Sequence, residues 1–295
     1  MVTKTLTYEN GKILEWKWAS DHKLIPSPFF TSTFFVDGIL IDAGPPAGVN
    51  DFKKFIRSLL KDTRIKLCAI THTHEDHCGG AFMLKQEFNI PIYAPKGAIG
   101  PLKEDYTYPQ YRQITWGEKR RSVQAQELPE TITSISETYQ FEVFPMPGHA
   151  SEQIALIEKG QEWVFAADAI QPKYKMLFGA SSDIQEDMAI IYSSIKKLYK
   201  YTSNMEDLKI FLSGPGVYEG REFIKQKLEE IEDLHKKVHQ FYNEESNRYD
   251  DEEKILRKVL KRLFKRETAV GRLTDGDLSI MNLIRSLLEW PLNNS

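Results

Sequence analysis

The chain has 295 residues, of which 41% are hydrophobic and 12% aromatic, with two cysteines and a formal net charge of −3. This length suits one large domain, or one domain with an extension, while the composition excludes a disulfide framework, a global basic field and a membrane-spanning apolar run. The N-terminus has no signal-peptide pattern, so we expect a soluble, cytoplasmic protein.

The first two-thirds of the chain mixes β-rich segments with helical ones. Asp37-Gly38 predicts a hairpin between the first two β-rich runs, because both positions tolerate positive φ. Asn50 is predicted to cap a helix that ends near Leu60, and further helices are expected up to Phe88 and over residues 187–199. The predicted strands are residues 29–36, 39–43, 64–70, 90–94, 141–144, 153–158, 162–167 and 209–213.

Residues 96–125 show no clear hydrophobic period. They contain several aromatic residues, among them Tyr108 and Trp116, and the basic triplet Lys119-Arg120-Arg121. Two interpretations stay open. The segment is either an irregular insertion that covers a pocket or a surface loop that its aromatic side chains hold against the core.

The character of the chain changes after about Glu219. The remaining residues are highly charged, and their apolar side chains recur at three- and four-residue steps, which is typical of helices packed on a core. We expect helices over residues 224–241, 251–266 and 277–290, and no strands. The chain is therefore interpreted as a domain of mixed strands and helices, residues 1–218, with a helical C-terminal extension, residues 219–295.

Three of the seven histidines fall within six residues, directly after a predicted strand, in Thr71-His72-Thr73-His74-Glu75-Asp76-His77-Cys78-Gly79-Gly80. Imidazole nitrogens and carboxylate oxygens are ligands that zinc, iron and manganese accept. His72 and His74 project to the same side of an extended backbone, and a turn then lets Asp76 and His77 approach from another direction. This spacing predicts a metal site rather than a polar loop with accidental histidines.

Other potential ligands receive a structural interpretation. Cys78 is interpreted as a small packed residue at the turn into a helix. His235 and His239 lie four residues apart on one predicted helical face, and their neighbours Lys236 and Lys237 favour a solvated face over a metal pair.

The pattern His72-x-His74-x-Asp76-His77 resembles the signature of metallo-β-lactamase-fold hydrolases, which include glyoxalase II, lactonases, β-lactamases and RNA-processing nucleases. Three more stretches resemble the family's motifs in order and spacing, namely Leu40-Ile41-Asp42-Ala43-Gly44, Pro147-Gly148-His149 and Phe165-Ala166-Ala167-Asp168. The resemblance covers about residues 13–216. It implies an α/β fold, the αβ/βα sandwich, with the site at one edge where strand ends meet.

Carried over residue by residue, the resemblance implies two metal positions that share a bridging Asp168, with Asp42 in a supporting role. The first position would use His72, His74, His149 and Asp168. The second would use Asp76, His77 and Asp168, together with one more histidine from a late P-G-H-G motif. The expected cofactor is zinc, as one or two ions, although the same ligands accept iron or manganese.

The late motif departs from the family pattern, because Ser213-Gly214-Pro215-Gly216 places a proline where the histidine is expected. A proline side chain offers no donor to a metal. Four outcomes stay open: one metal in the first position, two metals with water completing the second, Glu219 in place of the histidine, or a degraded enzyme.

The resemblance implies a metal-dependent hydrolase. A Lewis-acidic metal lowers the pKa of its bound water and supplies hydroxide as nucleophile, and Asp76 would orient that water or act as the base. The lead hypothesis is hydrolysis of a small ester, thioester or lactone, so the expected partner is a small-molecule substrate and not a membrane. The alternatives are a phosphodiesterase that cuts single-stranded RNA and a non-catalytic metal-binding module.

The RNA alternative depends on residues 254–266, a basic amphipathic helix. The favoured interpretation is a helix docked on the core with a solvated cationic face. The other is a docking surface for phosphate, in RNA or in a coenzyme-like tail. Nucleic acid is therefore not the favoured partner.

Overall fold

The computed structural model describes residues 1–23, 28–180, 182 and 184–292. Contacts within the chain define two compact units. The first comprises residues 1–145, 151–168 and 207–218, and the second comprises residues 146–150, 169–206 and 219–295. The division between residues 218 and 219 stays a prediction, and the contacts place residues 169–206 with the C-terminal helices.

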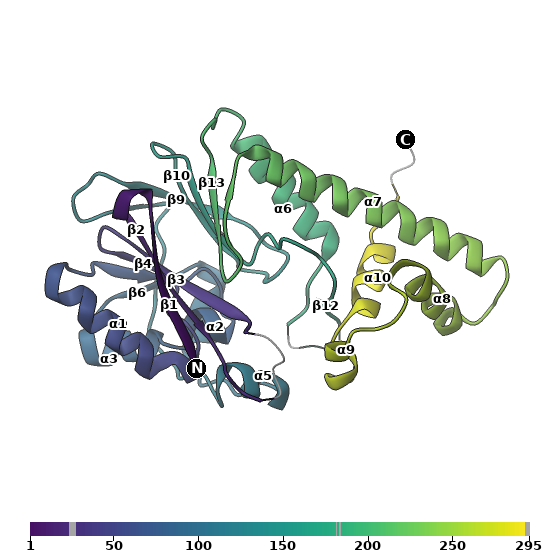
Figure 1. The fold of residues 1–295 in the computed structure, drawn as a ribbon, viewed down its shortest axis with the longest axis horizontal. Helices are drawn as coiled ribbons and strands as arrows, with labels where there is room; N and C mark the ends of the chain where they lie inside the picture. Colours follow the sequence, from purple (N-terminus) through teal and green to yellow (C-terminus); the bar gives the residue numbers. More distant parts are fainter. Residues whose placement is uncertain (24–27, 181, 183, 293–295) are drawn as a thin grey trace. The chain divides into compact units, whose positions relative to one another are not determined.

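Two β-sheets form the frame of the first unit (Figure 1). Among the described residues, one sheet has seven strands in the order β1-β2-β3-β4-β5-β6-β7, and the other has six in the order β14-β13-β11-β10-β9-β8. Their bounds are β1 Val2–Tyr8, β2 Ile13–Ala19, β3 Phe30–Val36, β4 Ile39–Ile41, β5 Leu67–Ala69, β6 Ile92–Ala94, β7 Gln126–Glu127, β8 Thr131–Thr133, β9 Gln140–Pro145, β10 Ile154–Glu158, β11 Trp163–Ala167, β13 Lys209–Leu212 and β14 Gly216–Glu219. The two sheets, with helices beside them, confirm the predicted α/β class.

The hairpin predicted at Asp37-Gly38 is confirmed, because β3 and β4 pair antiparallel with Val36 opposite Ile39. Successive side chains of these strands enter different cores, as the pleat of a strand requires. Phe34 joins an apolar cluster with Phe165 and Phe211 of the second sheet. The ring centroid of Phe34 lies 5.3 Å from that of Phe165 and 5.7 Å from that of Phe211, so this cluster joins the two sheets.

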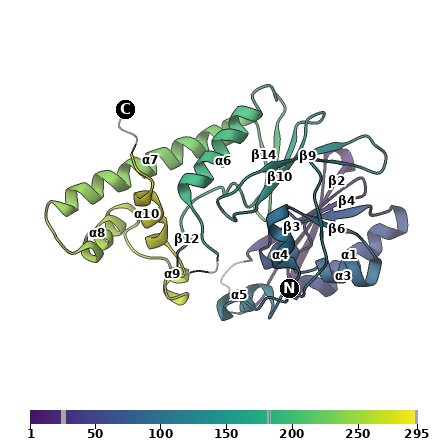
Figure 2. The same cartoon turned by 180° about the vertical axis from the view of Figure 1, so that it is seen from behind.

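A second apolar cluster lies between the seven-stranded sheet and helices α1 (Val49–Asp62) and α3 (Ala81–Phe88), which lie side by side in Figure 2. Phe52 and Ile56 of α1 are fully buried there, as the predicted amphipathic pattern requires. The predicted N-cap is wrong. Asn50 lies inside the first turn of α1, and Gly48 precedes the helix without a side-chain cap.

Residues 96–125 contain two short helices, α4 (Ile99–Leu102) and α5 (Gln110–Trp116). Trp116 is buried in the cluster beneath the sheet, and its ring centroid lies 6.2 Å from that of Trp18. Tyr108 is also buried, with 2% of its surface exposed. The aromatic residues of the segment therefore attach it firmly to the first unit.

The second unit is mainly helical (Figure 1). Its elements are α6 (Met188–Tyr201), α7 (Arg221–Ser246), α8 (Glu252–Phe264), α9 (Ala269–Leu273), α10 (Ile280–Glu289), β12 (Leu177–Phe178) and β15 (Leu278–Ser279). The expectation of no strand after residue 219 is wrong, because β15 pairs antiparallel with β12. Two residues are too few to show a strand period in the sequence. Within the described part of the chain, no helix combines the length and the apolarity that crossing a membrane requires.

The histidine pair on α7 is not a solvated face. Only 6% of His235 is exposed, and its Nε2 lies 2.7 Å from the carbonyl oxygen of Trp290, while His239 Nε2 lies 3.0 Å from that of Leu287. The last carbonyls of a helix lack partners within the helix, and ring N–H groups satisfy these two near the end of α10.

The basic helix α8 buries its apolar face through Ile255, Leu256, Val259 and Leu260. Two of its arginines form ion pairs with acidic residues of the same unit, Arg257 with Glu253 and Arg262 with Glu244 and Glu245. Part of the cationic face is therefore neutralised by neighbours.

Candidate metal centre

The site is built where the parallel strands β4 and β5 end side by side, with Ile41 opposite Ala69. Asp42 follows β4, and Thr71 follows β5 after one residue. Asp42 Oδ1 accepts a hydrogen bond from the Thr71 backbone N–H at 2.8 Å, and Oδ2 accepts one from the Thr71 hydroxyl at 2.9 Å. These bonds fix the start of the histidine-rich segment against the end of the neighbouring strand.

The segment then forms a single helical turn, α2 (Glu75–Cys78), whose four side chains are all buried. The backbone N–H of Ala43 donates to the carbonyl oxygen of His77 at 2.6 Å, which attaches the turn to the end of β4. Gly80 allows this close approach, because a Cβ there would lie 2.3 Å from the carbonyl oxygen of Ala43.

His77 stands between three carboxylates. Its Nδ1 lies 2.7 Å from Asp42 Oδ2, and its Nε2 lies 3.4 Å from both Asp76 Oδ2 and Asp168 Oδ2. Burial would lower its pKa, but the charges of Asp76, Asp168 and Asp42 raise it well above the ordinary histidine value. The buried ring thus lies in a concentration of negative charge that suits a cation.

Asp168 follows β11, where the pairing with β13 is irregular between Phe165 and Ala167. Ala167 has a positive φ of 46°, a backbone conformation that is costly for a residue with a Cβ. This local turn brings the Asp168 carboxylate to His77.

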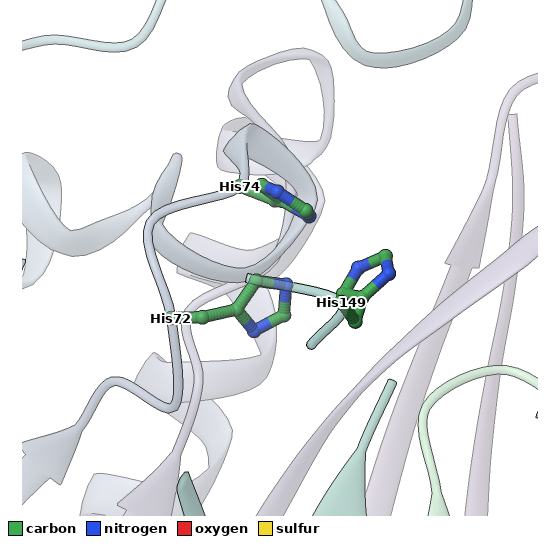
Figure 3. Close-up of side chains that lie close together, drawn as sticks. All are labelled: His72, His74 and His149. Atoms are coloured by element: carbon green, nitrogen blue, oxygen red, sulfur yellow. The ribbon is translucent and has the colours of Figure 1, made fainter. Parts of the chain in front are cut away.

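Five of the six predicted ligands fall into two groups that share His72, and within each group the donor atoms lie within 4.8 Å of one another. One group is His72, His77 and Asp168. The other is His72, His74 and His149, whose rings lie close together in Figure 3. Asp76 adjoins the first group through its 3.4 Å distance to His77.

Two residues that orient ligands were not among the candidates predicted from the sequence. Glu186 Oε1 lies 2.6 Å from His149 Nδ1, and Glu186 Oε2 accepts a hydrogen bond from the Phe178 N–H at 2.9 Å. Thr71 Oγ1 lies 3.0 Å from His72 Nδ1. Thr71 precedes the first histidine, so its position could have suggested a role, whereas Glu186 is 37 residues from His149.

The remaining candidates lie outside these groups among the described residues. Cys78 is 1% exposed, its Sγ donates to the carbonyl oxygens of Thr73 and His74, and burial raises its pKa to about 12, as suits a packed thiol. Pro215 and Glu219 are exposed. The turn before Pro215 is held by Lys17, whose Nζ donates to the carbonyl oxygen of Gly214 at 2.6 Å.

The donor set fits a divalent transition metal. Histidine nitrogens and aspartate oxygens are the usual ligands of zinc and of its neighbours in the first row. The Nδ1 atoms of His77 and His149 face carboxylates, an arrangement that orients a ring so that Nε2 is the ligand atom.

Comparison with known proteins supports the same family. Residues 26–203 match the family model of the metallo-β-lactamase superfamily. The chain is 29% identical over 134 residues to a hydroxyacylglutathione hydrolase of Bdellovibrio bacteriovorus, an alignment that covers 45% of this chain and 43% of that protein. It is 32% identical over 100 residues to a hydroxyacylglutathione hydrolase of Nitrosomonas eutropha, an alignment that covers 34% of this chain and 31% of that protein. The alignments thus span less than half the length of these curated relatives.

Solved structures share the fold at low identity. A metallo-β-lactamase from Pontibacter korlensis superposes with a TM-score of 0.59 at 15% identity, covering 78% of this chain and 99% of that one. The metallo-β-lactamase FIM-1 from Pseudomonas aeruginosa, in its mono-zinc form, superposes with a TM-score of 0.57 at 18% identity, covering 79% of this chain and 96% of that one. Because the family model spans more than half of the sequence, the chain belongs to the metallo-β-lactamase superfamily.

Proposed function

We propose that this protein is a metal-dependent hydrolase of a small thioester. One metal position would be held by His72, His74, His149 and Asp168, and the second by Asp76, His77 and Asp168. The observation that carries the proposal is the meeting of these histidines and aspartates at the ends of strands that lie far apart in the sequence.

The substrate class follows from the relatives and the metal from the donors. Hydroxyacylglutathione, which names the activity of both curated relatives, is an acyl thioester. The mixed nitrogen and oxygen donors favour zinc, while iron and manganese accept the same ligands. The other ester and lactone substrates of the sequence hypothesis are comparison substrates for the test.

When bound, the metal would activate water and polarise the substrate carbonyl. Asp76, with 9% of its surface exposed, would orient the attacking water or accept its proton. Asp42 holds His77 through Nδ1, and Glu186 holds His149 in the same way, so both rings present Nε2. Membership of a hydrolase family argues against the non-catalytic alternative, and the RNA alternative stays a prediction.

The test is elemental analysis of the purified chain, with His72→Ala and His149→Ala, and His22→Ala as the control because His22 is exposed. We expect one or two metals per chain in the wild type and in the control, and a loss of metal in the other two variants.

The same proteins are then assayed against an acyl-glutathione thioester, a simple ester and a lactone. We expect thioester hydrolysis that a chelator abolishes and added zinc restores. A wild-type chain that binds no metal after reconstitution, or a metal-loaded chain that leaves the thioester intact, would overturn the proposal.

A further inference from the structure

A buried ion pair adjoins the candidate second metal position, because Glu75 directly precedes the ligand Asp76 in the chain. Arg112 Nε donates to Glu75 Oε1 at 2.8 Å, and Arg112 Nη2 donates to Glu75 Oε2 at 2.5 Å. The exposed fractions are 2% for Glu75 and 5% for Arg112. Two parallel hydrogen bonds from one guanidinium fix both the distance and the orientation of a carboxylate, which a single bond does not.

The two partners come from different parts of the first unit. Glu75 is the first residue of the α2 turn and precedes the ligands Asp76 and His77. Arg112 lies on α5, in the segment that had no clear pattern in the sequence. The ion pair therefore ties the metal-binding turn to α5.

Arg112 is itself held in place. Its guanidinium carbon lies 5.4 Å from the centre of the buried Tyr108 ring. The side-chain amide of Gln113 donates to the Tyr108 carbonyl oxygen at 2.7 Å, and Trp116, one turn further along α5, is buried against Trp18. These contacts fix the position of α5 and therefore of the Arg112 guanidinium.

The α2 turn needs such support. A single turn of four residues is too short to be stable by itself, so tertiary contacts must decide its position. Successive helical residues point about 100° apart, so fixing the Glu75 side chain also fixes the directions of Asp76 and His77. The second metal position depends more on this support than the first does. Pro215 stands where a further histidine ligand is expected, so Asp76 and His77 make up a larger share of the ligands there.

We propose that the Glu75–Arg112 pair is a positioning device for the second metal position. The inference rests on the proposed function. The pair sets the rotation of the α2 turn, so that Asp76 and His77 face Asp168, and its loss weakens metal binding there while leaving the first position intact.

The test is a titration of the metal-free full-length chain with Zn²⁺ by calorimetry, which gives one dissociation constant for each bound ion. The single variant Arg112→Met leaves a buried carboxylate without its partner, which can prevent folding. The informative variant is therefore the double replacement Glu75→Leu with Arg112→Met, which removes both charges. His149→Ala and Asp76→Asn identify which step of the titration belongs to which position.

We expect the second dissociation constant of the double variant to rise by roughly 10- to 100-fold, the usual effect of losing a group that orients a ligand. The first constant should remain that of the wild type. Arg112→Lys keeps the charge without the paired hydrogen bonds. Its second dissociation constant should therefore lie between those of the wild type and the double variant. The control is Arg262→Met, which breaks the Arg262–Glu245 pair of the second unit and should change neither constant.

Each outcome has a distinct meaning. Two unchanged constants in the double variant would overturn the positioning role, and so would an equal rise in both. A wild-type chain that binds only one ion would also overturn it, while leaving the metal-dependent hydrolase intact. A wild-type chain that binds none would overturn the proposed function itself.

Discussion

The Glu186 carboxylate lies 2.6 Å from Nδ1 of His149, and both side chains are buried. A carboxylate in this place selects the ring orientation that presents Nε2 to a metal, and it makes that nitrogen a stronger ligand. Glu186 is fixed in turn by the backbone N–H of Phe178, so its position does not depend on a metal.

The first prediction concerns this residue. Glu186→Gln should weaken zinc binding at the first metal position by roughly 10- to 100-fold, because a neutral amide orients and polarises the ring less well. Calorimetric titration with Zn²⁺ measures the effect. Glu232→Gln is the matched control, because Glu232 also bonds a side chain of the second unit, Tyr192, but no candidate ligand. Equal affinities in Glu186→Gln and the wild type would contradict the prediction.

The second prediction concerns Asp42, which accepts hydrogen bonds from both Thr71 and His77. Asp42→Asn should weaken metal binding at the second position by at least about tenfold, because the His77 ring loses its charged partner. Asp37→Asn is the control, since Asp37 lies in the same hairpin and bonds Ser136 instead. Metal content after dialysis against a weak chelator separates the two variants. A metal loss of equal size in both would show that the effect is not specific to His77.

The third prediction concerns the turn that contains Pro215. Gly214 has a φ of +83°, and a Cβ at this position would lie 1.9 Å from the carbonyl oxygen of Phe30. Gly216 has a φ of +113°, but nothing lies within 4 Å of an added Cβ. Gly216→Ala should therefore lower the free energy of unfolding by about 1–2 kcal/mol through backbone strain alone.

Gly214→Ala should cost clearly more, because the clash adds to the strain. Denaturant unfolding of the two variants measures the difference. A cost for Gly214→Ala no greater than that for Gly216→Ala would show that the turn can move away from β3 freely.

The fourth prediction is a dependence of stability on pH. Burial lowers the pKa of His235 below its ordinary value of 6.5. The unfolded chain then binds a proton more readily than the folded chain, so this residue favours folding above about pH 6.5 and its contribution is lost as the pH falls below that value. His235→Gln removes the titrating group and should make the free energy of unfolding depend less on pH between 7 and 5.

The control for this comparison is His22→Gln, because His22 is exposed. Chemical denaturation at several pH values gives the slopes. A His235→Gln chain whose stability falls as steeply as the wild type would exclude His235 as the source of the acid sensitivity.

Features that depend on neighbours in the sequence were predictable. The hairpin at Asp37-Gly38, the apolar face of α1 and the period of α7 each follow from backbone geometry over a few residues. The ligand motif from His72 to His77 is of the same kind, because its four candidate ligands lie within six residues of the sequence. The errors also have local causes, since Asn50 lies one residue inside the helix that it was expected to cap, and β15 is too short to show a period.

Features that depend on the path of the chain were decided by the tertiary structure alone. Glu75 and Arg112 are 37 residues apart, as are His149 and Glu186, and no periodicity connects either pair. His235 and His239 looked solvated beside their lysines, yet the end of α10 covers them. The sequence by itself therefore determined the family, the metal-ligand chemistry and the strands β3 to β6, β9 to β11 and β13, because each of these depends on residues a few positions apart. It did not predict β1, β2, β7, β8, β12, β14 or β15. The partners that orient the ligands were decided by packing, because a buried carboxylate or guanidinium bonds whatever the fold brings to it.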